Sequence, residues 1–287
     1  MRTLTALAPA KLNRFLHIIG RRDDGYHWLQ TILHLIDYCD SLHFSLRDDT
    51  QIILMGYKDK AAMGKQPDDL FGYRNLVLQA ARLLQRLQAK PLGVDITLHK
   101  KIPVCAGLGG GSSDAAATLW ALNQLWRLHL PLPELKRLSL QLGTDVPFFV
   151  CGHSAWAEGI GEQLTALVLP SSYFLVLVPA VNVSTVEIFC DKQLTRDTAH
   201  SKITLSLLHK GHNDCESVVT RRYPEIAAAL AWLRQFNALA RITGTGSCVF
   251  AAFDKEEQAW RVAQQVPESW DYFIARGMNR SYNAGLQ

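Results

Sequence analysis

The chain has 287 residues, of which 48% are hydrophobic and 20% charged, so its composition is that of a globular protein with one large or two ordinary domains. Its net charge of +4 comes without a long basic run, which argues against nucleic-acid binding but suits an anionic small substrate. The six cysteines show no C-x-x-C spacing, and the sequence has neither a secretory leader nor an apolar run of about 18 residues, so we expect a cytoplasmic protein with reduced thiols, no zinc site and no membrane segment.

The first part of the chain predicts β-structure. Residues 3–8 form a strand that runs into the P-A-K-L-N stretch at 9–13 and continues as an apolar segment. Residues 29–38 fit another strand after an Asp-Gly turn, and residues 42–54 alternate as a further pair of strands. The polar segment 55–74 predicts a loop.

A helix, a strand, a glycine-rich loop and a second helix follow. Asn75 is expected to cap the first helix, which has an apolar face through residue 87, although it could instead border a nucleotide site. Val94, Ile96 and Leu98 alternate with polar neighbours, which is typical of a half-buried strand.

Glycines 107, 109, 110 and 111 join this strand to the second helix, for which Ser112 or Ser113 is the expected N-cap and Asp114 a first-turn residue. Glycine lets the backbone approach a ligand closely, and the first amides of a helix lack internal partners. Together they predict an anion site, a cradle for a polyphosphate. The loop is neither a Walker A loop, which would continue with Lys-Ser/Thr, nor a dinucleotide fingerprint, because Ser112 replaces the last glycine. A plain connector is the alternative.

Beyond residue 126 the pattern predicts short helices and strands, with a domain boundary near residues 155–172. Residues 143–149 are expected to end a helix, and residues 191–212 to be rich in loops. The expected helices span 135–142, 184–190, 224–236 and 255–265, and the expected strands span 152–157, 174–178, 248–253 and 271–276.

Three separated stretches resemble the motifs of the GHMP kinases: P-A-K-L-N at 9–13, G-L-G-G-G-S-S-D-A-A at 107–116 and G-T-G-S-C at 244–248. The resemblance covers nearly the whole chain. It implies an α+β fold of two domains, with residues 1–160 forming an ATP-binding domain of mixed sheet and helices. Residues 161–287 would form a ferredoxin-like α/β domain, with the substrate cleft between the two.

Two further stretches, R-R-D-D-G-Y-H at 21–27 and G-T-D-V-P-F at 143–148, are more specific. They resemble the branch of this family that phosphorylates the 2-hydroxyl of cytidine diphosphate-linked methylerythritol in non-mevalonate isoprenoid precursor biosynthesis. The resemblance implies ATP and Mg²⁺ as cofactors, with the metal ligands unknown. It also implies a monomer or weak homodimer without nucleic-acid or membrane partners.

The resemblance matches Lys11 and Asp145 to catalytic residues. Asp145 would be the general base for the substrate hydroxyl, and Lys11 would stabilise the developing charge. Asn13 shares a strand face with Lys11 and would bind substrate or orient the lysine. Because Pro147 disfavours a helical residue before it, the Asp145 carboxylate is expected to project from a helix-to-strand corner into a cleft. From the residues alone, Lys11 could be a surface lysine, and Asp145 could simply belong to a helix-terminal turn. ATP would bind Pro103, Val104, Cys105, Ala106, Gly107, Leu108, Gly109, Gly110, Gly111, Ser112 and Ser113.

At the other end of the substrate, the resemblance implies that Tyr26 stacks on the cytosine ring and His27 reads its hydrogen-bonding edge. Phe189 would cover the other face of the ring, and Thr185 would contact hydroxyls or phosphate. An aromatic residue beside a turn can equally be a packing residue. Leu33 stands where some relatives carry an aromatic residue.

Two other features are less specific. The 244–248 turn carries Thr245 where relatives have serine, and it is expected either to allow close approach near the phosphoryl-transfer site or to be a plain turn. His209 and His212 have the spacing of a metal pair, but they lie in a polar segment without a third ligand.

Three rival functions follow from the same residues: a kinase for another small alcohol such as homoserine or mevalonate, a nucleotide-binding protein without catalysis, and an RNA-binding protein of the same fold. The rings expected from Tyr26 and Phe189 argue against the first. The presence of both Lys11 and Asp145 argues against the second, and the lack of a basic stripe against the third.

Overall fold

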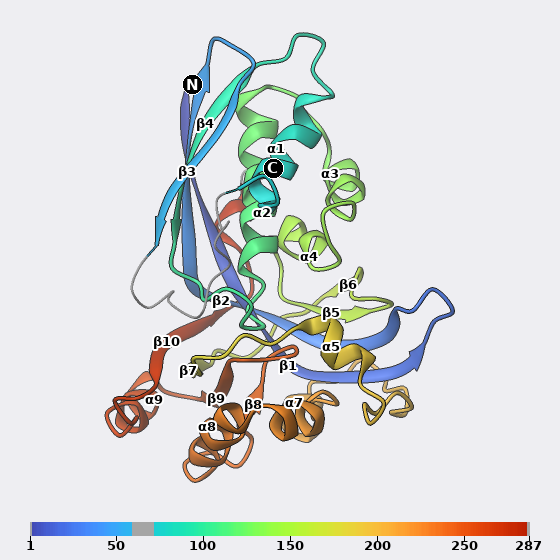
Figure 1. Cartoon of the computed structure of the whole chain (residues 1–287), viewed down its shortest axis with the longest axis vertical. Helices are drawn as coiled ribbons and strands as arrows, with labels where there is room; N and C mark the ends of the chain where they lie inside the picture. Colours follow the sequence, from blue (N-terminus) through green and yellow to red (C-terminus); the bar gives the residue numbers. More distant parts are fainter. Residues whose placement is uncertain (1, 59–71, 286–287) are drawn as a thin grey trace.

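Two long antiparallel strands, β1 (Thr3–Arg21) and β2 (His27–Arg47), run through both halves of the molecule (Figure 1). The structure is a computed structural model that describes residues 2–58 and 72–285. Residues at the start of β1 alternate between exposed and buried, whereas residues 8–18 are buried without interruption. The start of β1 therefore faces solvent on one side, while its second part lies between layers. Three register shifts, the first between Pro9 and Ala10, let the pair bend.

Within the described residues, further strands extend this pair into one ten-stranded sheet. They are β3 (Ile52–Lys58), β4 (Gly93–Lys100), β5 (Ala155–Glu158), β6 (Gln163–Ala166), β7 (Tyr173–Val178), β8 (Arg241–Ile242), β9 (Val249–Phe253) and β10 (Asp271–Met278). The order is β3-β4-β2-β10-β7-β9-β8, with β1 and β5 also paired to β2, and β6 to β5. The β2–β10 pair joins the two halves of the chain.

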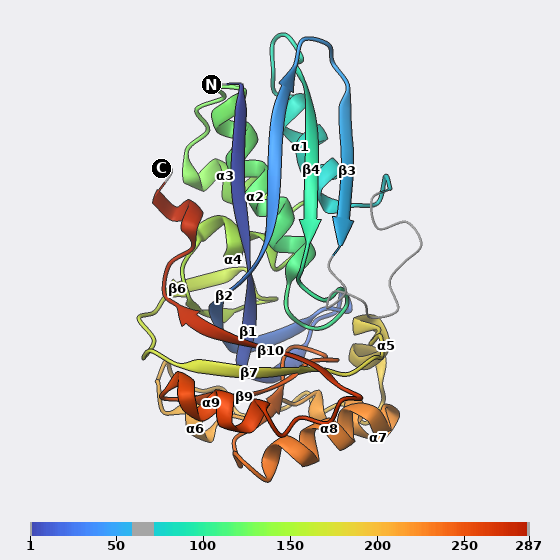
Figure 2. The same cartoon turned by 90° about the vertical axis from the view of Figure 1, so that its left-hand side faces the viewer.

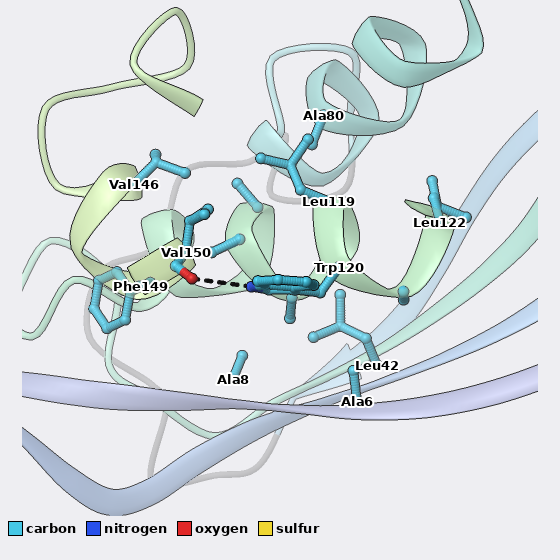
Figure 3. Packing of buried hydrophobic residues seen from close by; sticks show 14 of the residues in the cluster. Ala6, Ala8, Leu42, Ala80, Leu119, Trp120, Leu122, Val146, Phe149 and Val150 are labelled. Carbon is cyan, nitrogen blue, oxygen red and sulfur yellow. Dashed lines mark hydrogen bonds between the residues drawn. The ribbon is translucent and has the colours of Figure 1, made fainter. Parts of the chain in front are cut away.

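Four helices cover one face of the sheet in the first half (Figure 1): α1 (Leu76–Gln85), α2 (Gly110–Leu125), α3 (Leu132–Ser139) and α4 (Val146–Cys151). Helix α2 is central and buried on nearly all sides, as its run of small and apolar residues requires. Figure 3 shows Trp120 of α2 above the sheet, where Ala6 and Ala8 leave room for its ring. Its indole Nε1 donates to the Val150 carbonyl at 3.1 Å, which ties α2 to α4.

The second half contains α5 (Thr185–Cys190), α6 (Leu207–Lys210), α7 (Glu216–Arg222), α8 (Pro224–Arg234) and α9 (Glu256–Ala263). Helix α8 packs against β9, and α9 packs against β7, β9 and β10 (Figure 2). Leu16 and Ile18 of β1 belong to this second core, so the first strand serves both halves. The short 3₁₀ helix η2 (Tyr282–Gly285) returns to the first half, where Asn283 Nδ2 donates to the Leu7 carbonyl at 2.7 Å. The division at residues 160 and 161 stays a prediction.

The mixed sheet and its helices confirm the predicted α+β fold class, and several elements lie within two residues of their expected bounds. These are β4, β7, α5, α8, β9, α9 and β10. Asn75 caps α1 as expected, since its side chain accepts from the Val77 amide at 2.7 Å. None of the helices in the described part of the chain has the length and apolar composition that a bilayer crossing requires.

Three local expectations were wrong. Gly109, with φ +71°, is the N-cap of α2, and Ser112 and Ser113 lie inside its first turn, because glycine reaches the left-handed conformation without a side-chain cap. Asp145 has helical backbone angles and begins α4 rather than standing at a helix-to-strand corner, since Pro147 lies at the tolerated start of the helix.

The third concerns the loop predicted over residues 55–74. β3 continues to Lys58, because parallel pairing with β4 supplies its backbone partners, and residues 59–71 lie outside the described part of the chain. The pattern also missed α7, whose seven residues are too few to show a helical period.

The Trp120 hydrogen bond leads to a stability prediction. In Trp120→Phe the Val150 carbonyl loses its buried donor and the smaller ring leaves a void, so we expect the free energy of unfolding to fall by about 2–4 kcal/mol. Urea unfolding followed by circular dichroism measures this change. The matched control is Trp260→Phe, because Trp260 is 47% exposed. Equal losses in the two variants would contradict the assigned role of the buried indole.

A second prediction concerns pH. His34 is 1% exposed, and Nη1 of Arg14 donates to its Nδ1 at 3.2 Å. Burial, followed by the Arg14 charge, lowers the pKa of His34 to about 3. The unfolded chain therefore takes up a proton below about pH 6.5 that the native protein does not, and stability falls as pH decreases from there toward 3.

His34→Gln removes this titration. Between about pH 7 and about pH 5.5, the wild type should lose about 1 kcal/mol more unfolding free energy than the variant. Urea unfolding of both proteins at both pH values gives the difference, in which the other titrating groups cancel. Parallel pH profiles would show that His34 is protonated in the native protein.

Candidate active site

A cleft of about 800 Å³ lies where the two halves meet. Its walls include parts of β1 and β2, residues 73–76 at the start of α1, the 103–109 loop, the start of α2, residues 144–145 before α4, helix α5 and the 244–245 turn. Segments far apart in the sequence thus share one cavity. The predicted site residues that line it are Lys11, Asn13, Pro103, Val104, Cys105, Ala106, Gly107, Gly109, Gly110, Gly111, Ser112, Asp145, Thr185 and Phe189.

The backbone of the glycine loop is in contact with the 243–246 turn of the second half. Gly107 has φ +77°, and a Cβ there would lie 2.0 Å from the Thr243 carbonyl oxygen. Only glycine fits both the conformation and the gap. The Thr243 hydroxyl donates to the Gly107 carbonyl at 3.1 Å, and the Cys248 amide donates to the Ala106 carbonyl at 3.2 Å. The two glycine-rich turns therefore support each other.

The start of α2 presents backbone amides to the cleft. No side chain caps this helix, and Gly110, Gly111 and Ser112 line the cavity. The partial positive charge of a helix N-terminus and these amides are the features that favour an anion, as the sequence predicts here. Leu108 and Ser113, which were also predicted for the loop site, are 1% exposed and do not line the cleft.

Lys11 lies at the centre of the cleft with a buried ammonium group. Nζ donates to Asn13 Oδ1 at 2.6 Å and to the Gly107 carbonyl at 2.9 Å, and lies 3.7 Å from Asp145 Oδ2. Two hydrogen bonds and one nearby carboxylate thus surround the ammonium group. Burial lowers the pKa of Lys11, and Asp145 partly opposes that shift.

Two neighbours of Lys11 have different exposure. The Asp145 side chain is 39% exposed and reaches the cleft from the start of α4. Asn13 is buried. Its side-chain Nδ2 donates to Thr31 Oγ1 at 3.1 Å, and its backbone N–H donates to Thr243 Oγ1 at 3.0 Å. The Asp145 carboxylate is therefore accessible to a ligand, whereas the Asn13 side chain is held in place and fixes the position of the Lys11 ammonium group.

A second buried lysine, Lys100, lies beneath the start of α2 and was missed by the sequence analysis. Nζ contacts Asp40 Oδ2, and Asp114 Oδ2 at 2.8 Å. Burial raises the pKa of Asp114 well above its ordinary value, against the effect of Lys100. The only signal in the sequence was that Asp40 and Lys100 each follow an apolar stretch predicted to be a strand. Within the described residues, Asp114 Oδ1 and Ser113 Oγ are buried without a hydrogen-bond partner.

The outer end of the cleft carries the aromatic residues. Phe189 lines the cavity, and its ring centroid lies 5.1 Å from that of His27 with the planes 34° apart. Thr185 Oγ1 lies 3.0 Å from Thr245 Oγ1. Tyr26 is 54% exposed and, like His27, is not part of the cavity wall. Arg196, from the segment predicted to be loop-rich, bonds to His27 and was not anticipated.

His209 and His212 were considered as a possible metal-binding pair. In the described part of the chain, no three His, Cys, Asp or Glu side chains are grouped to hold an ion. His212 Nε2 lies 2.8 Å from Asp214 Oδ1.

Comparison with protein families matches both halves of the chain. Residues 75–153 match the GHMP kinases N terminal domain, and residues 201–271 match the GHMP kinases C terminal domain. The first match contains the glycine loop and Asp145, and the second contains the 244–248 turn.

Similar curated proteins extend over nearly the full chain. A 4-diphosphocytidyl-2-C-methyl-D-erythritol kinase of Ralstonia pickettii is 51% identical, covering 94% of this chain and 92% of the relative. The protein of the same name from Pseudomonas aeruginosa is 48% identical, covering 97% and 95%.

Solved structures agree with these matches. A crystal structure of 4-(cytidine 5'-diphospho)-2C-methyl-D-erythritol kinase has a TM-score of 0.80 at 30% identity, covering 96% of this chain and 99% of that one. Homoserine kinase from Cytophaga hutchinsonii, at 17% identity and a TM-score of 0.68, covers 99% of this chain and 96% of its own, and shares the fold. This chain is therefore a small-molecule kinase of the GHMP kinases and belongs to the 4-diphosphocytidyl-2-C-methyl-D-erythritol kinase family.

Proposed function

We propose that the enzyme transfers the terminal phosphoryl group of ATP to the 2-hydroxyl of 4-diphosphocytidyl-2-C-methyl-D-erythritol, a step of non-mevalonate isoprenoid precursor biosynthesis. The observation that carries the proposal is the 3.7 Å approach of Lys11 Nζ to Asp145 Oδ2 beside the glycine loop. A cation, an accessible carboxylate and an anion cradle then share one cleft, which is the equipment that phosphoryl transfer to an alcohol needs.

The glycine loop and the start of α2 bind the phosphates of ATP. Gly110, Gly111 and Ser112 line the cleft at the start of α2, where no side-chain cap is present among the described residues. Their amides would provide charge-assisted hydrogen bonds to phosphate oxygens. Phosphoryl transfer requires positioning and charge compensation more than covalent chemistry. A backbone cradle on a buried helix provides the positioning.

Asp145 accepts the proton of the attacking hydroxyl as transfer proceeds. Its exposed carboxylate can approach a substrate, whereas Lys11 is buried behind it. Lys11 places a positive charge 3.7 Å from Asp145 Oδ2 and donates hydrogen bonds to Asn13 and to Gly107. The base and the loop that holds the phosphates are thus positioned by the same ammonium group.

The residues present also suit Mg²⁺, which accompanies ATP in most kinases. Asp114 Oδ1 is buried without a hydrogen-bond partner among the described residues, and Asp114 lines the cleft. Oxygen donors of this kind, together with phosphates and water, are what Mg²⁺ prefers. Asp114, which lines the cleft, would hold the ion, and Mg²⁺ would neutralise phosphate charge when bound.

The outer end of the cleft accommodates the nucleobase. Phe189 offers a ring face and His27 a polar edge beside it, and base stacking on an aromatic ring is worth about 1–3 kcal/mol. Tyr26 lies next to His27 at the rim and can cover the base from outside. Thr185 is placed between this end and the 244–245 turn for contacts to hydroxyls or phosphate. A small aliphatic alcohol would leave these rings without a partner.

Removal of the general base tests the mechanism. In Asp145→Asn we expect kcat to fall about 10²- to 10⁴-fold, while affinity for a non-hydrolysable ATP analogue stays near wild type, because the amide keeps the shape but accepts no proton. A coupled ADP-release assay with the CDP-linked alcohol and calorimetric titration measure the two quantities. The control is Asp254→Asn, which changes an exposed aspartate directly after β9 and should leave both kcat and ATP-analogue affinity unaltered. Turnover close to wild type in Asp145→Asn would remove this residue from the proton transfer.

The glycine loop offers another test. Gly107→Ala places a Cβ 2.0 Å from the Thr243 carbonyl in a left-handed conformation, so the loop must move. We expect ATP affinity to fall at least about tenfold. The unfolding free energy should decrease by more than the roughly 1–2 kcal/mol that a left-handed conformation costs a residue with a side chain, because the Cβ also clashes. Gly25→Ala is the matched control, because Gly25 has φ +90° with nothing within 4 Å of its added Cβ. Unchanged ATP affinity in Gly107→Ala would show that the loop contact does not shape the cradle.

A further inference from the structure

The guanidinium group of Arg196 lies behind the His27 ring at the outer end of the cleft. Its Nε donates to His27 Nε2 at 3.0 Å. Its other nitrogens donate to backbone carbonyls at 2.7–3.1 Å, those of Phe189, Asp191 and Leu194. Arg196 is therefore anchored to the segment that carries Phe189, and one of its N–H groups is directed at the imidazole.

This contact determines where the proton of His27 lies. A guanidinium group only donates hydrogen bonds, so Nε2 must present its lone pair, and the proton of the neutral ring is on Nδ1. His27 is 6% exposed. Burial, then the charges of Arg196 and Arg21, lower its pKa, which agrees with a neutral ring.

Nδ1 of His27 is open to a ligand. This nitrogen has no hydrogen-bond partner among the described residues, and it keeps some exposed surface. Side chains two residues apart on a strand share a face. His27 therefore begins the row of β2 that continues with Leu29, Thr31 and Leu33, all of which line the cleft. Its ring lies beside Phe189, the aromatic wall of that end.

We propose that Arg196 is a positioning residue that sets nucleobase specificity, by holding His27 as an Nδ1 donor that pairs with N3 of cytosine and opposes the N3–H of uracil. The inference rests on the proposed function, because it assumes that a nucleobase occupies this end. Cytosine N3 is an acceptor and uracil N3 is a donor, so a fixed donor distinguishes the two. Without Arg196 the imidazole can move its proton to Nε2, and Nδ1 can then accept from uracil as well.

The tautomer can be observed without any substrate. In protein labelled with ¹⁵N-histidine, two-bond ¹H–¹⁵N spectra distinguish protonated from bare ring nitrogens, and the absence of signals in His27→Gln identifies those of His27. We expect a bare Nε2 and a protonated Nδ1 in the wild type, and a shift toward protonated Nε2 in Arg196→Met. A protonated Nε2 in the wild type would overturn the proposal, even if Arg196→Met failed to fold.

Calorimetric binding of CMP and UMP tests the specificity. The wild type should bind CMP more tightly, and Arg196→Met should reduce the CMP-to-UMP affinity ratio about tenfold, the effect of one mispaired donor. Loosening of the Phe189 segment alone would weaken both nucleotides and leave the ratio unchanged. The control is Arg21→Met, which removes a nearby charge that also acts on His27 but no bond to it, and which should preserve the ratio.

The outcomes separate the two proposals. An unchanged ratio in Arg196→Met overturns the role of Arg196, while phosphorylation of the CDP-linked alcohol by the wild type leaves the proposed function standing. If the wild type binds neither CMP nor UMP, the nucleobase role of His27 and Arg196 fails. The proposed function fails only if the wild type does not phosphorylate the CDP-linked alcohol.

Discussion

The buried ammonium group of Lys11 is the interaction on which the rest of the site depends. A charge removed from water costs several kcal/mol unless it is fully partnered, and each partner of Lys11 comes from a different part of the chain. Asn13 belongs to β1, the Gly107 carbonyl to the glycine loop, and Asp145 to the start of α4. Their need to satisfy one ammonium group brings the anion cradle and the accessible carboxylate to the same point.

The contact between the two glycine-rich turns supports this centre from the other half. Thr243 accepts from the Asn13 amide and donates to the Gly107 carbonyl. The gap is so narrow that no side chain fits at Gly107. The second half thus contacts the surroundings of Lys11 through backbone and a single hydroxyl, and the cleft lies where both halves share β1 and β2.

Two histidines of this structure are held neutral by the same chemistry in different surroundings. Arg14 donates to His34 in the core, and Arg196 donates to His27 beside the cleft. In both cases an arginine that cannot accept a hydrogen bond dictates which nitrogen keeps the lone pair. His34 is enclosed, and the pairing there contributes to the pH dependence of stability. His27 has an open Nδ1, and the same pairing becomes a means of recognition.

Much of this protein could be read from its residues one stretch at a time. Strand alternation, the glycine loop before a helix, and Pro224 at a helix start are local signals, because period, backbone freedom and capping act over a few residues. The motifs that contain Lys11, Asp145 and the glycine loop also indicated the resemblance to the GHMP kinases. Only the tertiary structure decided that α2 begins on Gly109, that Asp40 and Asp114 share Lys100, and that Arg196 reaches His27 across 169 positions. Those features depend on burial and on partners far away in the chain, and a charge's need for a partner is invisible until folding removes the water around it.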